Sequence, residues 1–206
     1  MRRHRLLWVL GVATLAAALA LLTTFASAVP PGKGEHGRKA QHVRWDIISL
    51  VGGNFPGPAN PGGHASATAP DGDTITLTGS GTFVAPASGK GSRAVRGGGT
   101  WTTSLGGSGT YRVTALVSWT FANFQATTPT LIDNIDHGRR SNGTAVLKIA
   151  FSDGSTGVLT VGCHGPGAPP GIFEGIATTK GYKTYYTVQP PAAGVDANRT
   201  IFHLRR

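Results

Sequence analysis

The segment GTYRVTALVSWTF, residues 109–121, alternates apolar and polar side chains over most of its length. The apolar face of this segment holds Tyr111, Val113, Ala115, Val117, Trp119 and Phe121. Threonine, arginine and serine dominate the opposite face. A period of two residues predicts an antiparallel strand with one face packed on a core and the other in water. The segment therefore indicates an all-β fold.

The same alternation recurs along the chain and predicts about nine strands. Besides residues 109–121, the predicted strands are 42–51, 73–85, 98–103, 144–151, 156–163, 172–180, 182–188 and 199–204. Turns rich in glycine separate several of them, at residues 104–109, 152–155 and 180–181. Beyond residue 28, no stretch shows the 3.6-residue apolar period of a helix.

Serial hairpins of this size predict a single-domain antiparallel β-barrel of about eight strands, with a β-sandwich as the alternative. The chain has 31 glycines. Three Gly-rich stretches, GSGTF (79–83), GGGTW (97–101) and GSGTY (107–111), each place an aromatic residue two positions after a glycine. Glycine inside a strand permits the sharp bends of a curved sheet and makes room for aromatic side chains, which favours the barrel.

The first 28 residues have the layout of a secretory signal peptide. The basic start MRRHR precedes an apolar run of 17 residues, 6–22, and Ala26-Ser27-Ala28 supplies the small residues of a cleavage site. We expect cleavage after Ala28 and not a membrane anchor, because the apolar run is at the short limit for spanning a bilayer. The protein is then secreted, with no transmembrane segment after cleavage.

Downstream of the signal, residues 29–41 are rich in Pro, Gly and charge and are predicted to be a flexible N-terminal tether. Residues 42–206 are predicted to form the one β-barrel-like domain. The Ala/Gly/Arg-rich composition and the style of the signal indicate a bacterial source.

The secreted part is basic. Three of the 19 Lys and Arg residues and none of the nine acids lie in residues 1–28, which leaves a formal net charge of +7. These cations are scattered, and the pairs Arg139-Arg140 and Arg205-Arg206 are too short for a nucleic-acid patch. We expect a monomer that attracts anionic polymers of the cell envelope and does not bind nucleic acid.

A single cysteine excludes an internal disulfide, and the histidines show no metal-binding spacing. We therefore predict neither a metal site nor a cofactor. His137 lies beside Asp133 and Asp136, but a calcium loop needs more oxygen ligands, so these residues are interpreted as a solvated loop.

Candidate catalytic residues lie in the stretch VGCHGPGAPPGIFEGI, residues 161–176. Cys163 continues the apolar face of its strand, and the adjacent His164 would point to the opposite side, so the two are poorly placed to act together. Glu174 lies within a predicted strand, where it faces either the interior with Ile172 and Ile176 or the solvent. If it is buried it must have a partner, and it would then be the strongest site candidate.

Three predicted loops, 52–69, 123–143 and 165–171, would rim a pocket if they met at one end of the barrel. The second carries Phe124 and Arg139-Arg140. The residues considered for ligand binding are Trp45, Tyr182, Tyr186 and Arg112.

The sequence favours a non-catalytic binding module for a small apolar ligand or a cell-envelope component, because it carries no recognisable catalytic motif. One alternative is a small secreted enzyme of the isomerase, cyclase or hydrolase type, which would use Glu174 or His164 in the barrel mouth. The other is a structural cell-surface protein held in place by its positive charge.

Overall fold

The computed structural model describes residues 40–52, 57–85, 94–127 and 131–205. These residues form an all-β protein without helices, which confirms the predicted fold class. Lys39–Arg206 is a compact unit. The predicted signal peptide (1–28) and nearly all of the predicted tether lie outside the described residues.

Thirteen strands make up the described part of the chain. They are β1 (Gln41–Leu50), β2 (Ala59–Pro61), β3 (Ala65–Thr68), β4 (Thr74–Leu77), β5 (Ser80–Ala85), β6 (Val95–Thr103), β7 (Ser108–Phe124), β8 (Arg139–Phe151), β9 (Thr156–Cys163), β10 (Gly175–Lys180), β11 (Lys183–Tyr185), β12 (Thr187–Val188) and β13 (Gly194–Arg205).

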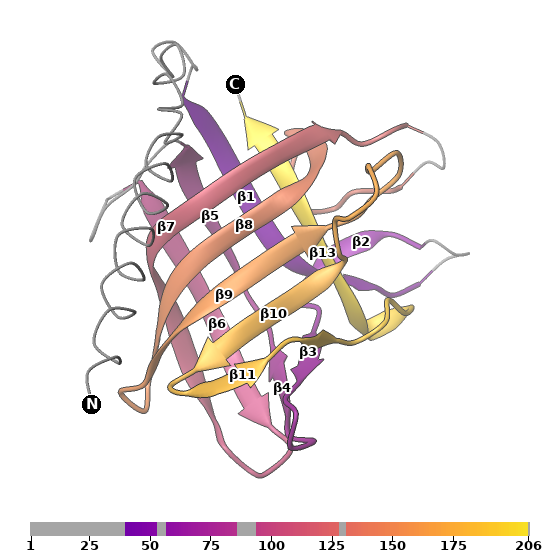
Figure 1. Cartoon of the computed structure of the whole chain (residues 1–206). Helices are drawn as coiled ribbons and strands as arrows, with labels where there is room; N and C mark the ends of the chain where they lie inside the picture. The colour runs from indigo at the N-terminus through magenta and orange to yellow at the C-terminus, as the bar shows by residue number, and fades with distance from the viewer. Residues whose placement is uncertain (1–39, 53–56, 86–93, 128–130, 206) are drawn as a thin grey trace, which may run out of the picture. The chain divides into compact units, whose positions relative to one another are not determined.

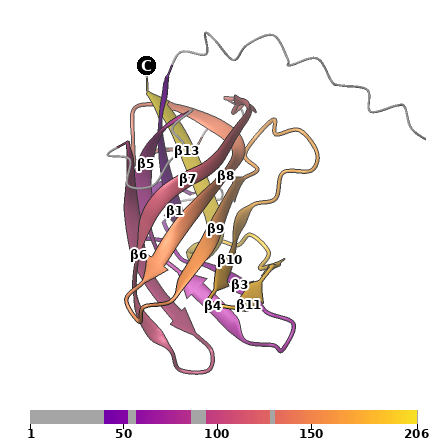
Figure 2. The ribbon, with the colours of Figure 1, turned by 60° about the vertical axis from the view of Figure 1, so that its left-hand side comes forward.

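Six strands close into an antiparallel barrel in the order β8-β13-β1-β5-β6-β7, with β7 pairing back onto β8 (Figure 1). The remaining strands extend from this ring, since β9, β10 and β11 continue from β8, and β4, β3 and β12 continue from β6 (Figure 2). The long strand β8 makes this possible, because its first residues pair with β13 and its later residues with β9. The hydrogen-bonded ring is therefore smaller than the predicted eight strands.

The register of β7 against β8 shifts at three places, and the first two shifts change which side chains face the core part-way along the strand. The register shifts between Val113 and Ala115 and again between Leu116 and Ser118. Leu116 is consequently buried and Val117 is half exposed, so the prediction that Val117 faces the core was wrong. Each extra residue of a bulge moves the following side chains to the other face, and simple alternation does not reveal it.

The predicted loop 52–69 contains two short strands, β2 and β3, and this part of the prediction was wrong. The segment buries Ala59, Ala65 and Ala67 completely. Alanine carries too little apolar surface to mark a strand in the sequence. The predicted strand 73–85 is likewise two strands, β4 and β5, separated at Gly79, whose φ is +153°.

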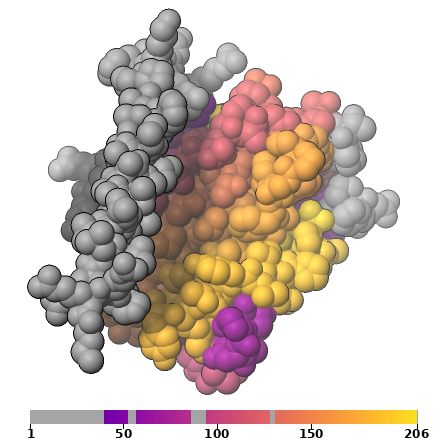
Figure 3. All heavy atoms as spheres, viewed as in Figure 1, coloured from indigo at the N-terminus to yellow at the C-terminus, as the bar shows by residue number. Residues whose placement is uncertain are grey.

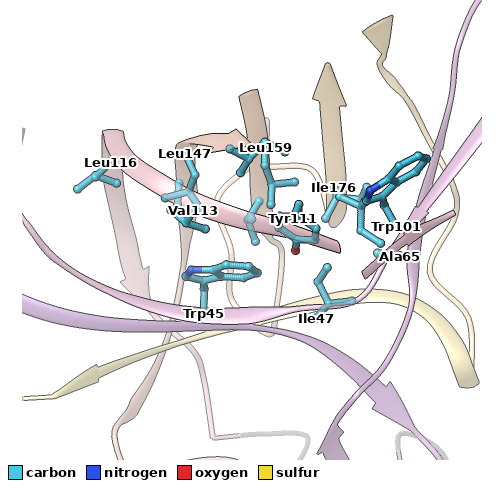
Figure 4. Close-up of a cluster of buried hydrophobic side chains, with 14 of the residues drawn as sticks. Trp45, Ile47, Ala65, Trp101, Tyr111, Val113, Leu116, Leu147, Leu159 and Ile176 are labelled. Atoms are coloured by element: carbon cyan, nitrogen blue, oxygen red, sulfur yellow. The ribbon is translucent and has the colours of Figure 1, made fainter. Parts of the chain in front are cut away.

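Large apolar side chains fill the barrel interior (Figure 4). Trp45, Phe83 and Phe202 are fully buried there. The indole of Trp45 lies against the backbone of β5 and β6, where a Cβ at Gly81 would come within 2.7 Å of Nε1 and a Cβ at Gly97 within 3.2 Å of the ring. The glycine-rich strands thus seat aromatic rings against a curved sheet, as the sequence predicted.

A second, smaller apolar cluster lies outside the ring. Ile48 of β1 and Ile201 of β13 are buried under Leu131 and Ile135, which belong to the connection between β7 and β8. This connection also bonds to β2, because Ala59 N donates to Ile132 O at 2.8 Å and Asn134 N donates to Ala59 O at 3.0 Å. The outer face of the barrel is therefore covered here. Among the described residues, no helix is long and apolar enough to cross a membrane.

Candidate functional site

The three segments predicted as loops meet at one end of the barrel. The connection 125–138 bonds to β2 as described above, and Ala126 N donates to Pro166 O at 2.8 Å. Asn123 Nδ2 also donates to Gly167 O at 2.6 Å. The loop 164–174 accordingly lies beside the end of β7 (Figure 3).

A pocket of about 390 Å³ opens at this end. Its walls are formed by Phe124, Gln125, Thr127, Leu131, Asp133, Asp136, His137, Gly138, Arg139 and Arg140. All of these residues belong to the end of β7, the start of β8 and the connection between them. A pocket of this volume is in the range of small-ligand sites.

Both carboxylates of the pocket wall are engaged by side chains of β13. Asp133 Oδ2 lies 2.7 Å from His203 Nε2, and His203 is fully buried. Asp136 forms an ion pair with Arg205, and Arg44 NH1 lies 3.9 Å from its Oδ2. Burial is the largest single effect and raises the pKa of Asp136, but the hydrogen bonds from Arg205 and Gly138 N and the nearby charge of Arg205 together hold the pKa below its ordinary value. Asp133 and Asp136 thus hold the connection onto the barrel instead of forming the solvated loop that we predicted.

The two arginines of the pocket wall are less engaged. The Arg139 guanidinium lies over the Phe124 ring, 3.5 Å from its centroid, and Phe124 packs edge-on against Phe121 at 5.0 Å. Arg140 NH1 donates to Leu131 O at 3.3 Å. Among the described residues, most of the N–H groups of these two guanidinium groups therefore have no hydrogen-bond partner.

Glu174 joins two strands that do not pair with each other. We had predicted that Glu174 lies inside a strand. The structure places it just before β10, outside any strand. Its Oε2 accepts a hydrogen bond from His164 N at 2.5 Å, and its Oε1 accepts one from Thr200 N at 2.7 Å. Thr200 Oγ1 in turn donates to Gly162 O at 2.6 Å. The carboxylate thereby connects the end of β9 to β13.

Burial controls the acidity of this cluster. Burial raises the pKa of Glu174 to about 7, against the opposing effect of the two backbone N–H donors. The Cys163 thiol is 1 % exposed, and its pKa is raised, first by burial and then by the nearby Glu174 carboxylate. A protonated, buried thiol is a poor nucleophile. His164 is exposed, and its Nδ1 lies 2.7 Å from Ile172 O.

Two polar side chains connect this cluster to the pocket. Gln125 lines the pocket, and its Nε2 donates to Cys163 Sγ at 3.3 Å. Asn142 is fully buried, accepts from Gly165 N at 2.8 Å and donates to Asn123 Oδ1 at 2.9 Å. Sequence reasoning missed Gln125 and Asn142, because their partners lie 19 to 38 residues away in the chain.

The four residues considered for ligand binding do not form one site. Trp45 has no exposed surface and belongs to the core. Tyr182 is 97 % exposed at the β10–β11 turn, and Tyr186 is exposed between β11 and β12. Arg112 is exposed on β7, opposite Gly98 and Ala150.

Within the described ranges, no group of three or more His, Cys, Asp and Glu side chains is arranged to hold a metal ion. No protein-family model, curated protein sequence or solved structure matches this chain.

Proposed function

We propose that this protein is a non-catalytic binding module whose ligand is an anionic component of the cell envelope, bound in the pocket outside the barrel. The observation that carries this proposal is the available positive charge of the pocket. Arg139 and Arg140 line it, while Asp133 and Asp136 are already paired with His203 and Arg205. Hydrogen bonds from guanidinium groups to oxyanions are among the strongest in proteins.

Two further features support this choice of ligand. The sequence left a small apolar ligand as an equal possibility, but the barrel interior is occupied by large side chains such as Trp45 and Phe202. The formal net charge of +7 beyond residue 28 would attract a polyanion over a distance of about 8 Å at physiological ionic strength.

The test compares two double variants that remove the same charge. R139A/R140A removes both arginine side chains from the pocket wall, whereas R112A/K148A removes two exposed cations from β7 and β8. Binding to purified anionic cell-wall polymers is measured by calorimetry. We expect R139A/R140A to weaken binding at least about tenfold, since each lost charge-assisted hydrogen bond costs about 1.5–3 kcal/mol.

The matched control separates this proposal from the structural alternative. R112A/K148A should leave the affinity nearly unchanged, because these side chains lie outside the pocket. Equal weakening by both variants would mean that general charge attraction, as in a structural surface protein, explains the binding.

One observation favours the enzymatic alternative, which is the pKa of Glu174 near 7, as suits a general acid or base at neutral pH. Both of its carboxylate oxygens, however, already accept backbone hydrogen bonds. An enzyme of this kind would lose turnover in E174Q while R139A/R140A kept it, which is the reverse of the pattern expected for the binding module.

A further inference from the structure

We infer that Arg139 acts as a planar two-pronged donor that selects ligands carrying an oxyanion with two adjacent oxygens, a carboxylate or a phosphodiester. This inference rests on the proposed function and names the chemistry that the pocket recognises. The pocket would thus distinguish among anions by shape as well as by charge.

The stacked position of Arg139 is the basis for this inference. Its guanidinium carbon lies 3.5 Å from the centroid of the Phe124 ring. A guanidinium stacked on an aromatic face keeps its in-plane N–H groups at the edge, where they are free to bind. Within the part of the chain that the structure describes, the Arg139 guanidinium forms no side-chain hydrogen bond or ion pair besides its contact with the Phe124 ring.

The platform beneath Arg139 is itself held in place. Phe124 is the last residue of β7 and pairs with Ser141 of β8. Its ring contacts Phe121 edge-on, with an interplanar angle of 65°. A pre-positioned fork loses less side-chain entropy on binding than a mobile lysine or arginine, so it can provide selectivity in addition to affinity.

Arg140 supplies a second positive charge from the other side of β8. Successive residues of a strand point to opposite faces, and Arg139 pairs with Leu204 while Arg140 pairs with His203. Both nevertheless line the same pocket. Two cations that approach from two sides suit a ligand with repeated anionic groups, such as a segment of a charged polymer.

The decisive variant is R139K, which keeps the positive charge but removes the fork. Arg139 is exposed, so lysine is accommodated there without repacking. R112K makes the same substitution on the exposed face of β7 and serves as the matched control. The full protein is titrated by calorimetry with oligogalacturonate for carboxylates and with oligo(glycerol phosphate) for phosphodiesters. Methyl-esterified oligogalacturonate is the uncharged counterpart.

We expect the wild-type protein to bind at least one of the two charged oligomers and to ignore the esterified one. The oligomer that binds identifies the source of the oxyanion, and binding of both supports the shared chemistry. R139K should weaken binding about tenfold, and R112K should leave it unchanged.

Two other results would separate the role of Arg139 from the proposed anion-binding function. If R139K binds like the wild type while R139A/R140A loses binding, the pocket still holds an anion but the fork is refuted. If the wild-type protein binds neither charged oligomer, the proposed function itself fails, and the inference about Arg139 fails with it.

Discussion

Glu174 makes the stability of this protein depend on pH in a direction opposite to that of most carboxylates. Its carboxylate accepts hydrogen bonds from His164 N and Thr200 N, but burial dominates and raises its pKa from 4.5 to about 7. The native state therefore binds the Glu174 proton more tightly than the unfolded state does. Between those two pKa values, unfolding releases a proton, so a rise in pH favours the unfolded chain.

The size of the effect follows from the two pKa values. One pKa unit corresponds to 1.36 kcal/mol, so a rise from 4.5 to about 7 is worth roughly 3 kcal/mol. This stabilisation is fully present below pH 4.5 and is lost as the pH rises through 7. In E174Q the side chain cannot ionise, so the same loss should be absent.

The assay is urea unfolding followed by tryptophan fluorescence, since Trp45 and Trp101 are buried. The free energy of unfolding is compared between pH 5 and pH 8 in the wild type and in E174Q. From pH 5 to pH 8, the free energy of unfolding of the wild type should fall by up to about 3 kcal/mol more than that of E174Q. D153N is the control, because the hydrogen bond from Lys180 holds the pKa of Asp153 at about 2, so this carboxyl stays ionised from pH 5 to 8.

The pKa can also be measured directly. The chain has only two glutamates, Glu35 and Glu174, so selective ¹³C labelling of glutamate gives two carboxyl resonances to follow by NMR. Parallel stability curves for the wild type and E174Q, or two glutamate resonances that both titrate near 4.5, would refute the reasoning.

Three further predictions concern the core and its attachments. Y185F should lower the free energy of unfolding, measured by urea titration, by about 1–2 kcal/mol, because the Tyr185 hydroxyl donates to the buried Asp73 at 2.8 Å. An unchanged urea midpoint would contradict this. G81A should lower the thermal midpoint markedly, because the new Cβ would meet a backbone oxygen at 2.3 Å and the β1 indole at 2.7 Å, whereas S80A, at the exposed preceding residue, should leave it unchanged. Cys163 should react slowly with a thiol reagent in the native protein and rapidly in urea, and fast native labelling would show that the thiol is not in the core.

The sequence predicted the strands whose alternation is strong and regular. Residues 156–163 match β9, and the predicted strand 42–51 differs from β1 by one residue at each end. The prediction from sequence was wrong where the buried residues are only weakly apolar, as with the alanines of β3. It was also wrong where an extra residue interrupts the two-residue period, as near Val117. Alternation alone does not show where a bulge falls, because a bulge is an extra residue in one strand relative to the strand it pairs with.

The site was predictable only in its short-range part. Cys163, His164 and Glu174 were considered together because they are close in the sequence, and the structure does place them together. Thr200, which donates to Glu174, lies 26 residues away on another strand, so no local pattern could reveal it. Whether Glu174 faced the interior or the solvent depended on where β10 begins, and the structure places it half-buried just before that strand. The boundaries of elements are the least certain feature of a sequence pattern.

The place of β13 in the ring has a consequence for how the chain acquires its shape. Strand β13 lies between β1 and β8, so the first described strand of the ring pairs with one that follows all the other described strands in the sequence. Until residues 194–205 arrive, β1 and β8 each keep a row of unpaired backbone groups, which invites association with other chains. During synthesis from the N-terminus onward, the ring would therefore stay open until β13 has emerged. Loss of residues 194–205 would leave an open sheet that is prone to associate with other chains, and not a smaller closed barrel.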